Sequence, residues 1–414
     1  MNPYLAVVLL ALAGTWALNA LAALLDLRAL SPELPPEFAA THDPERYRKS
    51  QEYARATTRF SLLRDTLGAA ALAAFILWPG FPLAEAAARS LGWPEIPTGL
   101  AFFALLALAA ELLGLPFDIY ATFGLEARFG FNRTTPATFA LDKLKALALA
   151  VLLGGPLLAA VLWFFLRAGA LAWVWAWLAA AGFSVALAVL APTLLLPLFN
   201  RFTPLADGPL RDAIADLAQR AGFALDGVFV MDGSRRSAKA NAFFTGLGRR
   251  KRIALYDTLI AAHPQDELLA VLAHEIGHFK RGHIRTRLAL SFLRLGLAFF
   301  LLSLALTLPG LHAAFGMDRV TVHGGLVFFA LLYTPLSLLL SLGGNALSRA
   351  HERQADAFAA DLTGAPAALA RALAALSAHN LANLTPHPLQ VALHHSHPPA
   401  LQRVRTLNAL AQKT

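Results

Sequence analysis

The chain has 414 residues, of which 57% are hydrophobic and only 15% charged, and it contains no cysteine. Soluble domains average roughly 45–50% apolar and about 25% charged residues, so this composition indicates that lipid is part of the solvent. The lack of cysteine excludes disulfides, thiolate-bound zinc and a cysteine nucleophile. The net charge of +9 fits basic loops beside anionic lipid. No basic stretch is interleaved with stacking aromatics, so we expect no nucleic-acid partner.

Seven apolar stretches are long enough to cross about 30 Å of hydrocarbon, which takes roughly 20 residues each. We place them near 4–26, 60–82, 98–121, 144–166, 171–199, 287–309 and 323–347. Asp65, Glu111 and Asp118 interrupt or flank the second and third, and they face either a polar interior or the headgroups. The first stretch lacks a preceding basic region, which argues against a cleaved signal peptide.

Basic residues in the short loops predict the orientation. They gather in the first and third loops, as Arg28, Arg46, Arg48, Lys49, Arg55 and Arg59, and as Arg128, Arg133, Lys143 and Lys145. Because positive residues stay on the cytoplasmic side, we expect the N-terminus outside and the odd loops and C-terminal tail inside. The Ala/Leu/Arg-rich composition is typical of a bacterium, so we expect a bacterial inner-membrane protein.

The chain thus divides into four regions. They are 1–199 with spans one to five, a soluble insertion at 200–286, 287–348 with spans six and seven, and a C-terminal region at 349–414. Periodicity in the insertion predicts helices at 210–221 and 266–283 and strands at 228–231, 242–245 and 253–256. The tail is predicted to form helices at 349–362 and 366–379, then a Pro/His-rich segment and a short last helix.

The predicted helix at 266–283 contains His274-Glu275-Ile276-Gly277-His278, an H-E-x-x-H pattern. The i, i+4 spacing stacks both imidazoles on one helical face, so both can reach one ion. Zinc lowers the pKa of a bound water toward about 7, and Glu275 can take its proton. The alternative is a pair of histidines on a solvated face, but the apolar run 268–273 argues against it.

A catalytic zinc needs a third protein ligand and one open position. The metzincin pattern would place a histidine six residues after His278, but that residue is Ile284, and His283 is one position too early. We therefore prefer Glu352 as the third ligand, with His351 and His283 as lesser candidates.

Asp356 shares a predicted helix face with Glu352 and could orient a ligand imidazole. The alternative for this pair is a surface helix on which Arg349 and Arg353 form salt bridges with the two carboxylates.

Several stretches resemble the Ste24-type CAAX prenyl proteases, which are integral-membrane M48 metallopeptidases. They are KSQEY at 49–53, EARFGFNRTT at 126–135, PLFNRFTPL at 197–205, RSAKANAFFTG at 236–246, the H-E-x-x-H motif, HERQAD at 351–356 and HHSHPP at 394–399. The resemblance implies a mainly α polytopic fold with seven transmembrane helices forming a barrel around a large water-filled chamber. It also implies a gluzincin-like cytoplasmic catalytic domain with a small β-sheet, and a zinc site that closes the cytoplasmic end of the chamber.

The resemblance also assigns roles to individual residues. It makes His274, His278 and Glu352 the ligands of one Zn²⁺ and Glu275 the general base. It places Asn241 and the following strand, Ala242, Phe243 and Phe244, beside the backbone of an extended peptide substrate.

Two further residues, His397 and Arg403, match a family histidine and arginine near the zinc, where such donors would stabilise an oxyanion. His397 could instead cap a helix before Pro398, and Arg403 could be a structural ion pair. Lys239 stands where many eukaryotic members have histidine, so a pH-dependent role at that position is not expected.

We expect a monomeric zinc metalloendopeptidase that cleaves a peptide or protein near its C-terminus, in or at the lipid membrane. The resemblance suggests prenylated CAAX substrates. One alternative is a quality-control protease for membrane proteins. Another is a transporter or channel with a structural metal site, but such a site would have four ligands and would not need Glu275.

Overall fold

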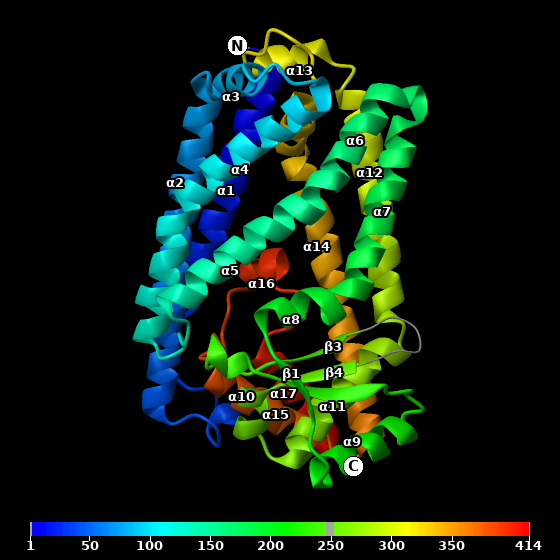
Figure 1. Ribbon diagram of the computed structural model, residues 1–414. Coiled ribbons are helices and arrows are strands. Elements are labelled where there is room, and N and C mark those ends of the chain that lie inside the picture. Colours follow the sequence, from blue (N-terminus) through cyan, green and yellow to red (C-terminus); the bar gives the residue numbers. More distant parts are fainter. Residues whose placement is uncertain (1, 246–251, 414) are drawn as a thin grey trace.

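The protein is mainly helical, with a bundle of long helices at one end and a small sheet with shorter helices at the other (Figure 1). This computed structural model describes residues 2–245 and 252–413. Within them, seven helical segments are long and apolar enough to cross a membrane, which confirms the predicted number of spans. The N-terminus lies at the end of the bundle farthest from the sheet (Figure 1).

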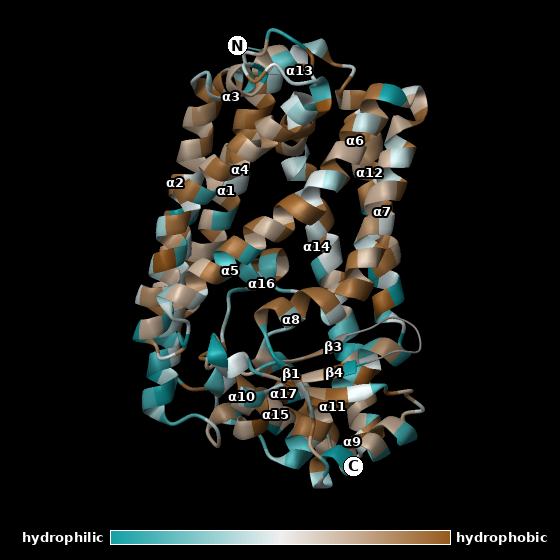
Figure 2. Cartoon of the chain, viewed as in Figure 1, coloured by the Kyte–Doolittle hydropathy of each residue, from teal (hydrophilic) through white to brown (hydrophobic). Residues whose placement is uncertain are grey.

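Several spans are chains of consecutive helical pieces. The seven are α1 (Pro3–Ala29), α2 (Pro44–Leu77), α4–η2 (Glu95–Ile119, Tyr120–Glu126), α5–η3–α6 (Pro136–Leu149, Ala150–Gly154, Gly155–Arg167), η4–α7–η5–α8 (Gly169–Leu171, Ala172–Leu190, Ala191–Leu195, Leu196–Phe199), α12 (His283–Ala305) and α14 (Val322–Thr363). Large apolar side chains such as Leu10, Leu77 and Leu293 are exposed on them, and Figure 2 shows these helices as predominantly hydrophobic. This surface suits contact with lipid rather than water.

Two spans extend well beyond their predicted ends. α2 begins at Pro44, where the side chain of Asp43 accepts a hydrogen bond from the backbone N–H of Arg46 and caps the helix. α14 continues to Thr363 and ends at Gly364, which has a left-handed φ of 62°. The predicted separate helix at 349–362 is therefore wrong: it is the lower part of α14, because nothing interrupts the helix at 348.

Charged residues within the spans form ion pairs with one another. The Lys143 ammonium lies 2.7 Å from Glu111 and 2.7 Å from Asp118, and Asp118 also pairs with Arg64 at 3.2 Å. Arg64 and Asp65 line a cavity of about 1230 Å³ between α1, α2, α4 and α14. The cavity thus supports the polar-interior alternative for Asp65, while the position of Glu111 and Asp118 relative to the headgroups stays a prediction.

The sheet is mixed, with the strand order β1-β2-β4-β3. Its strands are β1 (Phe202–Pro204), β2 (Gly227–Met231), β3 (Ala242–Thr245) and β4 (Arg252–Tyr256). β2 and β4 are parallel, and the other two pairs are antiparallel. Three of the four strands were predicted. β1 was missed because three residues are too few to show an alternating pattern.

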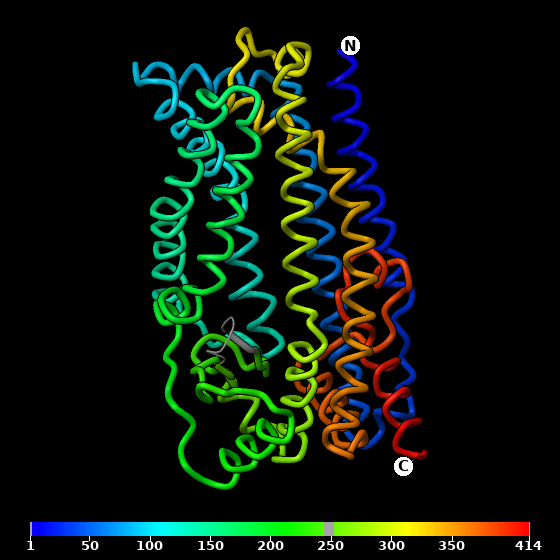
Figure 3. Tube along the Cα trace, turned by 90° about the vertical axis from the view of Figure 1, so that its right-hand side faces the viewer, coloured from blue at the N-terminus to red at the C-terminus, as the bar shows by residue number. Residues whose placement is uncertain are grey.

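Short helices surround the sheet and connect the spans. They are η1 (Pro36–Phe38), α3 (Gly80–Arg89), α9 (Pro209–Arg220), η6 (Gly233–Arg235), α10 (Asp257–Ala262), α11 (Gln265–Lys280), α13 (Pro309–Ala314), α15 (Pro366–His379), α16 (Pro388–His394) and α17 (Ala400–Ala411). A single buried core joins α9, β4, α11, α15 and α17 through Leu217, Ile253, Leu272, Leu369 and Leu407. In Figure 3, α16 and α17 lie beside the lower part of the blue N-terminal segment, on the opposite side from the sheet.

Two local features place α11 for its role. Helix α11 ends at Lys280 rather than at the predicted His283. Gly282 adopts a left-handed φ of 73° and is the N-cap of α12, which begins at His283. Gly277 allows close packing on α14, since a Cβ there would lie 3.2 Å from both Cα and O of Ala355. The H-E-x-x-H segment is therefore pressed against the lower part of α14.

Candidate active site

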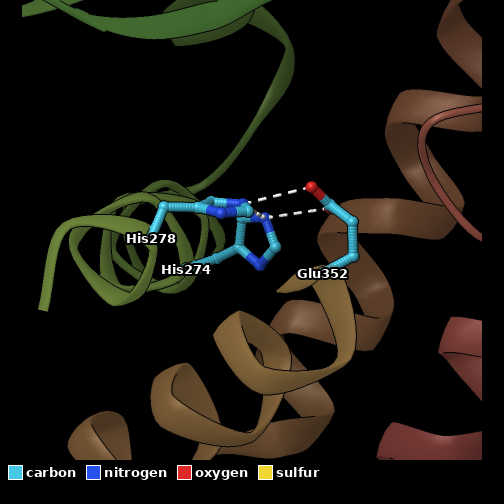
Figure 4. A group of neighbouring side chains, drawn as sticks. All are labelled: His274, His278 and Glu352. Atoms are coloured by element: carbon cyan, nitrogen blue, oxygen red, sulfur yellow. Dashed lines mark hydrogen bonds and ion pairs between the residues drawn. The ribbon is translucent and has the colours of Figure 1, made fainter. Parts of the chain in front are cut away.

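Two helices bring three possible metal ligands together. His274 and His278 project from one face of α11, and Glu352 faces them from the lower part of α14 (Figure 4). The two Nε2 atoms are 3.2 Å apart, and the Glu352 carboxylate lies 3.1 Å from His278 Nε2 and 3.4 Å from His274 Nε2. All three residues are buried, Glu352 with only 2% of its surface exposed.

The donor set fits a zinc ion. One atom from each of His274, His278 and Glu352 lies within 4.8 Å of the others, and this is the group of possible ligands found among the described residues. Glu352 Oε2 is buried and has no hydrogen-bond partner, as expected of an atom meant for a metal. Two imidazoles and one carboxylate leave the fourth tetrahedral position for water, which is typical of a catalytic rather than a structural site.

The lesser ligand candidates lie outside this group. His283 and His351 stack on each other, with ring centroids 4.0 Å apart, and His283 contacts the far side of the His278 ring. Both rings therefore lie behind the candidate ligand His278 and do not take its place. This excludes the two residues as ligands of the ion that His274, His278 and Glu352 would hold.

A second layer of charged groups holds His274. Asp356 Oδ1 accepts a hydrogen bond from His274 Nδ1 at 2.8 Å, which leaves Nε2 free for a metal. Arg403 donates two hydrogen bonds to Asp356, at 2.8 and 2.6 Å, and its Nη1 lies 3.4 Å from Glu352. Arg403 is thus both a buried ion pair and a neighbour of the ligand group.

The surface-helix alternative for Glu352 and Asp356 is wrong, because both carboxylates are buried. Arg349, one of the two proposed salt-bridge partners, donates instead to the backbone carbonyls of Val391 and His395.

His397 approaches the same centre from the segment before α17. Its Nε2 is 3.2 Å from Glu352 Oε1, while 62% of its side chain remains exposed. The helix cap that follows is Pro399, so the capping alternative for His397 is wrong. An exposed imidazole beside the ligand group can donate to a molecule bound there.

The environment of Glu275 suits a proton acceptor. Burial raises the pKa of its carboxyl above the ordinary 4.5, while the neighbouring His274 and His278 act in the opposite direction. A carboxylate with a raised pKa accepts a proton more readily in the transition state.

The edge of the sheet offers unpaired backbone groups. β3 is an edge strand, and the Asn241 carbonyl accepts a hydrogen bond from Tyr256 N–H. Because bonding direction alternates along an antiparallel strand, the backbone groups of Ala242 and Phe244 point away from β4, while those of Phe243 point toward it. Among the described residues, Ala242 N–H donates to the side chain of Asn241, at 2.9 Å.

Lys239, two residues before Asn241, is an ion-pair member. Its Nζ lies 3.0 Å from Glu126 and 2.8 Å from the Tyr53 hydroxyl, and it sits 4.7 Å above the Phe131 ring. Sequence reasoning missed Glu126 as a partner, although both residues lie in stretches that carried the family resemblance, because they are 113 positions apart.

Comparison with known proteins decides the family. Residues 25–201 match a domain described as CAAX prenyl protease N-terminal, five membrane helices, and residues 204–411 match Peptidase family M48. CAAX prenyl protease 1 homolog of Arabidopsis thaliana is 37% identical over 406 residues, 94% of this chain and 95% of that protein. The chain belongs to peptidase family M48.

Other relatives of this M48 peptidase agree along nearly the full chain. CAAX prenyl protease 1 of Saccharomyces cerevisiae is 36% identical and covers 92% of this chain and 90% of its own. The homolog from Homo sapiens is 31% identical and covers 92% and 89%. The crystal structure of S. mikatae Ste24p superimposes with a TM-score of 0.94 at 33% identity, covering 99% of this chain and 100% of that one.

Family membership, the seven spans and the ligand group together show an integral-membrane zinc metalloprotease. Its substrate is a peptide or protein, reached in a membrane environment.

Proposed function

We propose that this M48 peptidase hydrolyses a peptide bond near the C-terminus of a CAAX-type, isoprenylated substrate. The observation that carries the proposal is the buried group of His274, His278 and Glu352, with Glu275 on the same helix, at the sheet end of the helical bundle (Figure 1). The helices of that bundle line a cavity of about 1230 Å³. Relatives covering most of the chain are named CAAX prenyl protease 1. The mixed polar and apolar lining of the 1230 Å³ cavity suits a peptide that carries an apolar group.

Each side chain then has a defined task. His274, His278 and Glu352 would hold the zinc, which when bound would supply a polarised water of lowered pKa. Glu275 takes the proton of the attacking water and later delivers it to the leaving amine.

Asp356 keeps His274 in the tautomer that presents Nε2 to the metal. His397 would donate a hydrogen bond to a negatively charged substrate oxygen, since its imidazole is exposed beside Glu352. Arg403 adds positive charge from its buried position against Asp356.

The substrate backbone would pair with β3. The outward N–H and C=O groups of Ala242 and Phe244 form the edge for an extended peptide, and the Asn241 side chain releases Ala242 N–H when the peptide binds. Ala242 and Phe243 are half-buried, so strand addition rather than side-chain pockets would provide most of the contact at this edge.

We also propose that the active site is cytoplasmic and the N-terminus outside, in the inner membrane of a bacterium. The basic first and third loops lie at the same end of the molecule as the sheet, which supports this orientation (Figure 1). The bacterial host is inferred from composition alone, and the relatives compared above are eukaryotic. The site residues come from a single chain, so we propose a monomer.

The test uses the full chain in lipid nanodiscs with matched C-terminal CAAX peptides, farnesylated or not. We expect cleavage of the farnesylated peptide, loss of cleavage on zinc chelation, and recovery on zinc addition. Glu275→Gln should lower kcat by roughly 10²–10⁴ with zinc content unchanged. Equal cleavage of the unprenylated peptide would point to a quality-control protease instead, and full activity of Glu275→Gln would contradict the general-base role.

A further inference from the structure

The His278 ring is held from both sides. Its Nε2 faces the Glu352 carboxylate at 3.1 Å, while its Nδ1 lies 3.0 Å from Nδ1 of His283. The Nε2 of His283 lies 2.9 Å from Oε1 of Gln354. His278, His283 and Gln354 therefore form a continuous hydrogen-bonded row leading away from the metal centre.

The row allows one arrangement of protons when its rings are neutral. An amide oxygen can only accept, so His283 Nε2 must carry the hydrogen that it donates to Gln354. The remaining nitrogen, His283 Nδ1, is then an acceptor, and His278 Nδ1 must donate to it. This leaves the lone pair of His278 on Nε2, the atom that faces Glu352.

Packing holds the middle ring of the row. His283 is 1% exposed, and its ring is nearly parallel to that of His351, with an interplanar angle of 8° and centroids 4.0 Å apart. The left-handed Gly282 turns the chain so that His283, the first residue of α12, returns against α11. α14 supplies Glu352, His351 and Gln354, so one helix carries both a ligand and the support for His283.

The two candidate ligand histidines are thus oriented by different chemistry. His274 donates to Asp356, a carboxylate held by Arg403, whereas His278 donates to a neutral imidazole. A neutral acceptor fixes the tautomer without adding a further buried negative charge to those of Glu352 and Asp356.

We propose that His283 is a positioning residue that, together with Gln354, fixes the tautomer and ring orientation of His278 for zinc binding. This inference rests on the proposed role of His278 as a ligand. It assigns His283 and Gln354 a function outside the metal site, and it accounts for His283, a lesser ligand candidate that lies outside the ligand group.

The experiment measures zinc affinity of the full-length protein in detergent by competition with a chelator. His283→Phe keeps a ring to stack on His351 but removes the acceptor, and we expect zinc binding to weaken roughly 10- to 100-fold. His283→Asn retains an acceptor oxygen at about the position of Nδ1 and should restore most of the affinity. His42→Phe is the matched control, because His42 is equally buried against Phe38 and Tyr47 but outside the site.

A thermal-unfolding readout separates positioning from packing. If His283 acts on the metal, His283→Phe reduces the zinc-induced rise in Tm while leaving the Tm of the zinc-free protein close to that of the unmodified chain. Unchanged zinc affinity in His283→Phe, or the same loss in His283→Asn, would overturn the proposal. His278→Ala separates failure of the ligand assignment from failure of the positioning role. If His278→Ala retains full zinc affinity, the assignment of His278 as a ligand fails. If His278→Ala loses zinc affinity but His283→Phe does not, only the role of His283 is refuted.

Discussion

Asp356 makes three short polar contacts in the buried layer behind the metal centre, one from His274 and two from Arg403. Replacing it with leucine removes all three and leaves the Arg403 guanidinium with Glu352 at 3.4 Å as its nearest remaining counter-charge. Both stability and zinc binding should therefore decrease, for separable reasons.

The two magnitudes follow from burial and from the contact to His274. Breaking a buried ion pair by removing one partner costs about 3–5 kcal/mol, because the other charge stays desolvated. Arg403 is only 9% exposed, so we expect Asp356→Leu to approach that range. Loss of the acceptor for His274 Nδ1 should in addition weaken zinc binding roughly 10- to 100-fold.

A double variant separates the two effects. Asp356→Leu with Arg403→Met removes both charges, and replacing a buried pair by apolar groups is often neutral for stability. We expect thermal unfolding of the zinc-free double variant to return close to that of the unmodified chain, while chelator competition still shows weak zinc binding. Recovery of zinc affinity in the double variant would refute the idea that Asp356 acts through His274.

Three further predictions concern α11 and the sheet edge. Glu275 accepts a proton only when ionised, and burial raises its pKa above 4.5. We therefore expect kcat/KM to fall as the pH decreases through a midpoint above 4.5. A midpoint at or below 4.5 would contradict the role of Glu275 as the general base. Gly277→Ala places a methyl group 3.2 Å from the Ala355 backbone, so it should move α11 away from Glu352 and weaken zinc binding. The control variant Gly343→Ala, whose added methyl group has no atom within 4 Å, should leave zinc binding unchanged. Ala242→Pro removes an outward N–H without breaking the β3–β4 ladder, so the apparent Tm should be preserved. Loss of one hydrogen bond to the substrate should raise KM roughly two- to twelvefold. An unchanged KM would argue against strand addition.

Local sequence patterns were sufficient for the features that depend on near neighbours. Hydrophobic length predicted all seven spans, and i, i+4 spacing predicted that His274 and His278 share a face of α11. β2 and β4 were predicted because each has enough apolar residues to bury a strand within the core. Helix ends were less accurate, since α11 stops at a left-handed glycine and α14 continues where the hydropathy changes.

Only the tertiary structure decided which distant residues meet. Glu352 and Asp356 are adjacent to His274 because α14 continues past the apolar span and packs against Gly277, and Arg403 reaches His274 across 129 positions. The role inferred for His283 likewise depends on a turn and a stacked ring that no short spacing specifies. The sequence by itself determined the H-E-x-x-H helix and its membrane setting, because those follow from backbone periodicity and transfer to lipid. The completed ligand group and the residues that orient it depend on packing between helices, which local patterns do not contain.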